Sequence, residues 1–173
     1  MSSAGVVIRE ATSDDARAIA EVHMASWRWA YRGDLPAEFL DGLTVDDRER
    51  EWREWLAPEQ GAGTLVALEG GVIVGFCSFG PSRDDDADER TAEVRTIYLR
   101  EEVAGRGIGR DLFASASDRL CDLGYRRVTL WVMASNERSR RFYERAGWSW
   151  DGRTSAHRIE CGNVPIVRYA ADL

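Results

Sequence analysis

Residues 95–110 have the residue types and the spacing of an anion-binding loop. The apolar run RTIYL predicts a strand, and the following run, EEVAGRGIGR, predicts a bend that leads into a helix. Gly105, Gly107 and Gly109 let a ligand approach the backbone, and the unpaired N–H groups of a first helical turn attract an anion. The dinucleotide spacing G-x-G-x-x-G fails at Leu112, and the Walker spacing needs a lysine, which this chain lacks. We therefore expect a phosphate-binding loop of another kind.

A second motif lies in residues 136–148, which read NERSRRFYERAGW. Together the two segments resemble the GNAT superfamily of acyl-CoA-dependent N-acyltransferases. The pyrophosphate loop of that family reads Gln/Arg-x-x-Gly-x-Gly/Ala, and its later helix reads Asn-x-x-(small)-x-x-Phe-Tyr-x-x-x-Gly-Phe. The match covers residues 92–148. It departs at one position, because the family's Gln/Arg falls on Ala104, and we expect Arg106 and Arg110 to supply the missing contact.

The resemblance implies an α+β fold, the GNAT fold. Its central sheet is mixed, mostly antiparallel and seven-stranded, with a splay between the fourth and fifth strands and helices on its flanks. Sequence patterns agree and predict strands at residues 6–10, 64–69, 72–79, 92–99, 127–133, 148–154 and 164–170. Helices are predicted from Thr12 to near Gly33 and at residues 44–56, 107–123 and 137–146. The dipeptide Gly70-Gly71 predicts a hairpin between two of the strands.

The resemblance also implies acetyl-CoA as the acyl donor. In the family the pantetheine arm binds along the free edge of the splayed strand, which corresponds here to Ile97, Tyr98 and Leu99. The other implied cofactor-binding residues are Ala104, Gly105, Arg106, Gly107, Ile108, Gly109, Arg110, Asn136, Ser139 and Tyr143. No metal site is expected.

Acyl transfer from a thioester to an amine needs a group for the carbonyl oxygen, an acid for the leaving sulfur and an acceptor for the ammonium proton. A backbone N–H near Leu99 is the candidate for the oxygen. Tyr143 corresponds to the family's general acid, the alternative role being a core aromatic. Glu93, at the start of the central strand, is the candidate base acting through water, the alternative being a solvated glutamate at a strand end.

The first helix and the loop after it form the variable acceptor wall in the family. Trp27 and Tyr31, one helical turn apart, are therefore expected to bind the substrate together with Glu93, although Trp27 fits core packing equally well. His23 fits a packed helix residue better than a base. Cys77 lies in an apolar strand without a basic partner nearby in sequence, so we expect direct attack by the amine rather than transfer through a cysteine.

Composition predicts one domain over residues 1–173, with 44% apolar residues for its core. We expect a cytoplasmic protein with three reduced, buried cysteines, because neither a leader nor a membrane-spanning run is visible. Residues 1–93 carry a net charge of −11 and residues 94–173 a net charge of +4. The basic half suits a polyanionic cofactor. The acidic half suits a cationic amine or is a solvated surface, and its loop 84–89 is expected to be solvated.

The sequence thus predicts an acetyl-CoA-dependent N-acetyltransferase acting on a primary amine of a small molecule, such as an amino acid, a polyamine or an amino-bearing antibiotic. Two alternatives stay open: acetylation of a protein or peptide N-terminus, and a non-catalytic module that binds acyl-CoA. No nucleic-acid partner is expected at a pI of 5.0, and no membrane partner. The resemblance allows a homodimer, a state common in the family.

Overall fold

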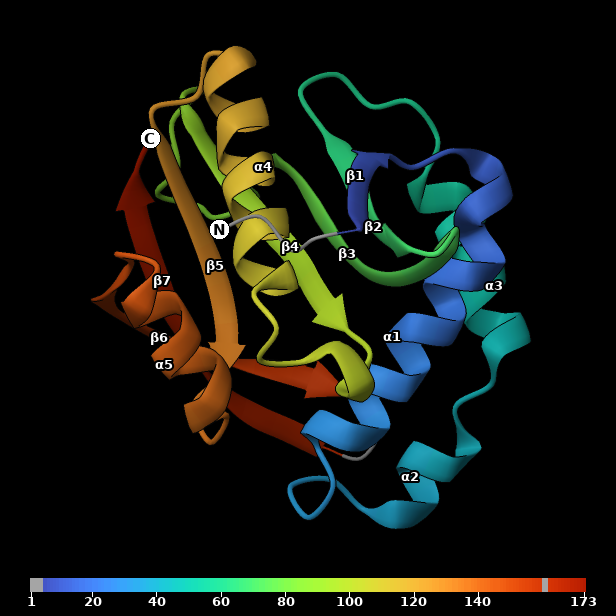
Figure 1. Cartoon of the computed structure of the whole chain (residues 1–173). Coiled ribbons are helices and arrows are strands. Elements are labelled where there is room, and N and C mark those ends of the chain that lie inside the picture. The colour runs from blue at the N-terminus through green and yellow to red at the C-terminus, as the bar shows by residue number, and fades with distance from the viewer. Residues whose placement is uncertain (1–4, 160–161) are drawn as a thin grey trace.

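The computed structural model describes residues 5–159 and 162–173, which form a seven-stranded sheet with helices on both faces (Figure 1). The strand order is β1-β2-β3-β4-β5-β7-β6, and β4 and β5 are the parallel pair in this otherwise antiparallel sheet. The strands are β1 (Val6–Glu10), β2 (Gly63–Glu69), β3 (Val72–Pro81), β4 (Thr91–Leu99), β5 (Arg127–Met133), β6 (Ser149–Ile159) and β7 (Gly162–Asp172). The helices are α1 (Ala16–Ala30), α2 (Ala37–Gly42), α3 (Val45–Trp55), α4 (Ile108–Asp122) and α5 (Glu137–Arg145). The predicted fold is confirmed.

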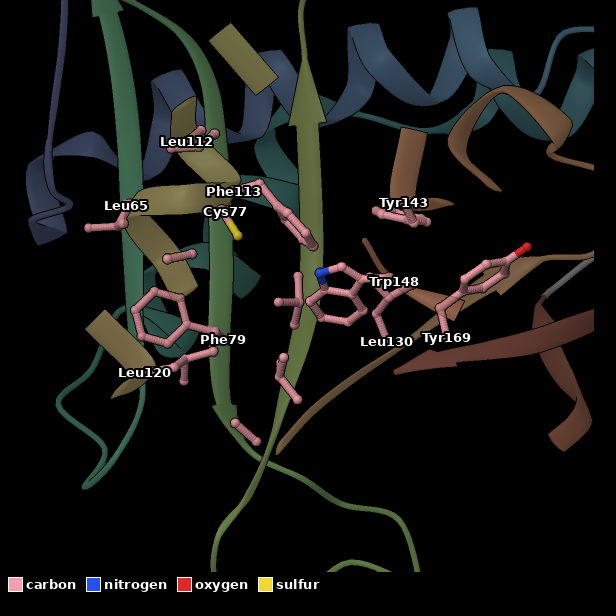
Figure 2. Close-up of a cluster of buried hydrophobic side chains, with 14 of the residues drawn as sticks. Leu65, Cys77, Phe79, Leu112, Phe113, Leu120, Leu130, Tyr143, Trp148 and Tyr169 are labelled. Atoms are coloured by element: carbon pink, nitrogen blue, oxygen red, sulfur yellow. The ribbon is translucent and has the colours of Figure 1, made fainter. Parts of the chain in front are cut away.

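Each face of the sheet carries its own hydrophobic cluster. On one face α4 and α5 pack against the strands, with Phe113 of α4 near Tyr143 of α5 (Figure 2). On the other face α1 and α3 pack against β2 and β3, where Trp52 contacts the ring of Phe76. The two faces therefore bring different helices to the same central strands.

Local signals explain most element boundaries. Thr12 and Asp15 form the predicted capping box, and Asp15 accepts a hydrogen bond from the Thr12 N–H at 2.8 Å. One short 3₁₀ turn precedes α1 there. Gly70 and Gly71 both have positive φ angles and join β2 to β3, as predicted. The last two strands, β6 and β7, are longer than predicted. They pair with each other out to Ile159, and the side chains of β6 are mostly exposed and polar.

The predicted splay is the feature of the sheet that matters for function. β4 pairs with β5 only from Thr91 to Glu93, whereas it pairs with β3 along its whole length. A bulge at Arg95 shifts the register against β3, so side chains before and after it change faces. From Val94 onward, β4 has one paired edge and one open edge.

The structure tests two predictions from composition only in part: the burial of the cysteines and the absence of a membrane-spanning run. Cys77 is buried as expected, but Cys121 is exposed on α4, so the prediction of three buried cysteines is wrong. The third, Cys161, lies outside the described residues. None of the helices in residues 5–159 and 162–173 is long and apolar enough to cross a membrane.

Candidate active site at the strand splay

The splay opens into a cavity of about 1420 Å³. Its donor side consists of the open edge of β4, the loop 104–107 and the first turns of α4 and α5. Its acceptor side consists of α1, α3, Glu93 and the loop between β3 and β4. Of the predicted site residues, fourteen line this cavity: Trp27, Tyr31, Glu93, Ile97, Tyr98, Leu99, Ala104, Gly105, Gly107, Gly109, Arg110, Asn136, Ser139 and Tyr143. The structure therefore brings together residues that are far apart in the sequence.

Two predicted cofactor residues do not line the cavity. The guanidinium of Arg106 is paired with the Glu69 carboxylate at the end of β2, on the outside of the loop. Ile108, the first residue of α4, is fully buried in the core. If these residues contact the cofactor, they do so through their backbone rather than through their side chains.

The open edge of β4 presents backbone groups to the cavity. The Arg100 N–H donates to the Val74 carbonyl of β3 at 2.9 Å. Because successive residues of an antiparallel ladder alternate in direction, the backbone groups of Leu99 and Ile97 point away from β3, toward the splay. The Ser26 hydroxyl of α1 donates to the Leu99 carbonyl at 2.6 Å and fixes this end of the strand. Sequence reasoning did not assign a role to Ser26.

The Leu99 side chain occupies space that two glycines leave free. A Cβ on Gly75 of β3 would collide with the Leu99 side chain, and a Cβ on Gly109 of α4 would come within 2.8 Å of it. Gly109 thus allows close packing between α4 and β4. Leu99 is packed against β3 and α4 and hydrogen-bonded to α1, which suits a backbone N–H that must hold one position.

The glycine loop has the backbone conformation that its sequence predicts. Gly105 and Gly107 have φ angles of 80° and 87°, in the left-handed region that favours glycine, and Gly107 is the N-cap of α4. The first N–H groups of α4 follow directly, which is the arrangement that binds phosphate at a helix N-terminus. Ala104 adds no side-chain donor.

Arginines from α5 also line the donor side, and sequence reasoning missed them. Arg138 and Arg145 join Arg110 along this part of the cavity. The guanidinium of Arg138 lies 3.8 Å from the ring centre of Trp29 on α1, so it bridges the two sides of the opening. Their spacing in the run ERSRRFYER is typical of any charged helix face, which is why no signal pointed to them.

Asn136 and Tyr143 are positioned by α5. The Asn136 side chain caps this helix by accepting the Ser139 N–H at 3.1 Å. Tyr143 is buried among aromatic rings and still lines the cavity. Burial raises its pKa above the ordinary value, so the hydroxyl keeps its proton at neutral pH. A protonated phenol is what a general acid requires.

Glu93 is not a solvated glutamate at a strand end. It is 7% exposed, and both of its carboxylate oxygens accept hydrogen bonds from Arg83, at 3.1 Å each from Nε and Nη2. Arg83 lies in the loop after β3, and no sequence pattern singled it out. The Glu93 carboxylate is therefore paired with a single arginine in the cavity wall.

The wall contributed by α1 is aromatic. The His23 ring stacks on the Tyr98 ring, with 5.0 Å between the ring centres. His23 Nδ1 accepts a hydrogen bond from Trp52 Nε1 at 3.1 Å. Burial and, to a smaller extent, the nearby Arg48 together lower the pKa of His23 to about 3, so His23 is neutral at neutral pH. Trp27 and Tyr31 contact each other edge to face at 5.1 Å within the same wall. His23 thus has the environment of a packed residue.

The loop 84–89 is mostly exposed, as expected, and it is also anchored to the sheet. Arg168 of β7 is 5% exposed and pairs with Asp84 at 3.0 Å, with Asp86 at 2.7 Å and with Asp151 at 2.7 Å. Asp84 also accepts a hydrogen bond from Trp131 Nε1 of β5 at 2.9 Å. These contacts hold in place the loop that carries Arg83.

Comparison with known proteins identifies the class of this fold and site. The family model described as acetyltransferase (GNAT) family matches residues 21–148, and the chain belongs to that family. The uncharacterized N-acetyltransferase YuaI of Bacillus subtilis is 35% identical over 76% of this chain and 73% of its own. The L-amino acid N-acyltransferase MnaT of Escherichia coli is 29% identical over 82% of this chain and 78% of its own.

A solved structure supports the same fold. The PaiA N-acetyltransferase of Thermoplasma acidophilum, in complex with coenzyme A, has a TM-score of 0.74 at 18% identity and covers 97% of this chain and 99% of its own. Family membership and the curated relatives make the protein an N-acetyltransferase.

Proposed function

We propose that this N-acetyltransferase moves an acetyl group from acetyl-CoA to a primary amine of a small molecule, by direct attack while both reactants are bound. The observation that carries the proposal is the splay: β4 leaves β5 after Glu93 and opens into one cavity. That cavity joins the glycine loop on the donor side to Glu93 and the aromatic wall on the acceptor side.

Each step has a residue in reach of the cavity. The edge of β4 receives the pantetheine arm in the manner of an added strand, and the N–H of Leu99 stabilises the carbonyl oxygen as its negative charge grows. Glu93 accepts a proton from the ammonium through water, which frees the nitrogen lone pair for attack on the carbonyl carbon. Tyr143 gives its proton to the sulfur as the carbon–sulfur bond breaks.

The two cysteines within residues 5–159 and 162–173 support direct transfer. Cys77 is fully buried, burial raises the pKa of its thiol, and it does not line the cavity. Cys121 is exposed on α4 and does not line it either. An acetyl-cysteine intermediate would need a thiolate beside the thioester, and neither residue offers one.

The side chains that surround the acceptor side of the cavity favour a small acceptor. The aromatic side chains of α1 and α3 and the ends of β6 and β7 all line the cavity there. Trp150 does not contribute to this cover, because it is 53% exposed and does not line the cavity. The name of the relative MnaT points in the same direction, since it is called an L-amino acid N-acyltransferase.

The test is a library of amines and short peptides with acetyl-CoA, followed by detection of free coenzyme A thiol. We expect turnover with small primary amines and initial-rate lines that intersect when both substrates are varied. Parallel lines would indicate a covalent acetyl-enzyme. Turnover confined to peptides would move the acceptor to a peptide N-terminus, and tight cofactor binding without turnover for any acceptor would indicate a sensor.

A further inference from the structure

The ion pair of Arg83 and Glu93 occupies the place where the amine must arrive. The Glu93 side chain is 9% exposed and the Arg83 side chain 67% exposed. Besides the two side-chain bonds, the Arg83 backbone N–H lies 3.4 Å from Glu93 Oε2. An ammonium that reaches Glu93 must therefore replace contacts that Arg83 now makes, and the exposed arginine is the partner that moves.

The other carboxylates near Arg83 are already engaged. Glu59 and Asp84 both interact electrostatically with Arg83. However, Glu59 holds Arg95 through two contacts of 2.8 and 3.0 Å, and Asp84 holds Trp131 and Arg168. Once Glu93 pairs with a substrate ammonium, Arg83 would gain most from a carboxylate that the substrate itself brings.

Several hydrogen-bond donors in this part of the cavity have no partner. Within residues 5–159 and 162–173, the buried side-chain polar atoms without a partner are Trp27 Nε1, Arg48 Nε, Arg95 Nε and Thr96 Oγ1. All four residues line the cavity, and each of these atoms can donate a hydrogen bond. Neighbouring atoms cover these four, whereas the Arg83 side chain is 67% exposed and accessible to a ligand. Donors without partners favour a ligand that carries acceptor oxygens.

We propose that Arg83 binds a carboxylate on the carbon next to the acceptor's amine, so that the acceptor is an α-amino acid or a close analogue. This inference rests on the proposed function. A zwitterion carries its two charges one carbon apart, so it can replace the adjacent Arg83 and Glu93 partners together and keep both paired. A polyamine or a peptide N-terminus has an ammonium without that neighbouring carboxylate. It would take Glu93 from Arg83 and give Arg83 no carboxylate in its place. The aromatic wall suits an apolar side chain.

The test compares acceptors that differ only in the carboxylate. Leucine is assayed beside isopentylamine and leucinamide, and phenylalanine beside phenethylamine and phenylalaninamide. The amines are more basic than the amino acids and the amides less basic, so a preference for the acid over both cannot come from amine pKa. We expect kcat/KM to favour at least one amino acid over both analogues by roughly 30-fold, the size of a charge-assisted contact.

Variants then assign that preference to Arg83. In Arg83→Met we expect the preference to fall close to one, mainly through a higher KM for the acid, and in Arg83→Lys to be partly kept. Arg119→Met removes an exposed arginine that pairs with Glu10 at 3.0 Å outside the cavity, and it should keep the parent's preference.

The outcomes separate this inference from the proposed function. Amines acetylated as well as amino acids by the parent, or a preference unchanged in Arg83→Met, would overturn the role of Arg83 and leave the small-amine acceptor standing. Failure of every amine, amide and amino acid, by an enzyme that still binds acetyl-CoA, would overturn both.

Discussion

The donor side and the acceptor side of the cavity are built from different materials. On the donor side the backbone supplies most of the candidate binding groups: the open edge of β4, two glycines with positive φ and the first turn of α4. On the acceptor side, side chains from separate elements meet, as Glu93 of β4 does with Arg83 of the next loop and His23 of α1 with Trp52 of α3. Backbone sites suit a ligand that never changes, and side-chain sites can be altered one residue at a time.

The comparison predicts that the largest loss comes where the two sides meet. Tyr143→Phe removes only a hydroxyl, and we expect kcat to fall roughly 10²-fold, the lower end of general-acid effects. Acetyl-CoA affinity, measured by calorimetry, should change much less. Tyr125→Phe is the control, because the Tyr125 hydroxyl donates to the Gly61 carbonyl and does not line the cavity. Full activity of Tyr143→Phe would mean that solvent protonates the sulfur.

On the acceptor side, Glu93→Gln keeps the shape of the side chain but removes the proton acceptor. We expect kcat/KM for the amine to fall roughly 30-fold at neutral pH, somewhat less than for a base in direct contact because the proton travels through water. The loss should shrink as rising pH supplies neutral amine directly. A pH–rate profile parallel to that of the parent would remove Glu93 from proton transfer.

On the donor side, Gly107→Val places a branched side chain at a φ of 87°, in the left-handed region that glycine adopts without strain and valine does not. We expect the distorted loop to weaken acetyl-CoA binding roughly 10-fold, equivalent to about 1.4 kcal/mol of strain and lost N–H contacts. Gly124→Val is the matched control, since Gly124 has a φ of 92° at the other end of α4 and does not line the cavity. Equal affinities in both variants and the parent would contradict the phosphate site.

The difference between the sides also explains what the sequence could predict. The glycine loop and the motif from Asn136 to Trp148 are local, so their residue types and spacing predicted both the fold and the donor side. Arg83 and Ser26 act through partners ten and seventy-three positions away, and no local pattern marks such a pair. The anchoring of loop 84–89 was missed for the same reason, because Arg168, which pairs with Asp84 and Asp86, lies on the last strand.

The smallest effect is expected on the free energy of unfolding, through the buried His23 of the acceptor wall. His23 has a pKa of about 3 in the folded protein, because burial disfavours its charged form, against about 6.5 in the unfolded chain. The unfolded state therefore binds a proton first as pH falls. Stability from neutral His23 is fully present above pH 6.5 and is lost on acidification, by about 1 kcal/mol between pH 7 and pH 5.5. The free energy of unfolding in urea across this range measures it.

His23→Phe should remove this part of the pH dependence, whatever it does to stability at pH 7 through loss of the acceptor for Trp52 Nε1. Tyr98, which stacks on His23, does not titrate in this window, because burial raises its pKa further above the ordinary value for a tyrosine. Asp15, with its pKa lowered to about 2 by Arg9, loses its contribution only below about pH 4. A slope between pH 7 and pH 5.5 that is unchanged in His23→Phe would mean that His23 accepts a proton in place. The acceptor wall would then be more open to water than the donor side, and its packed histidine would become accessible to protons from the cavity.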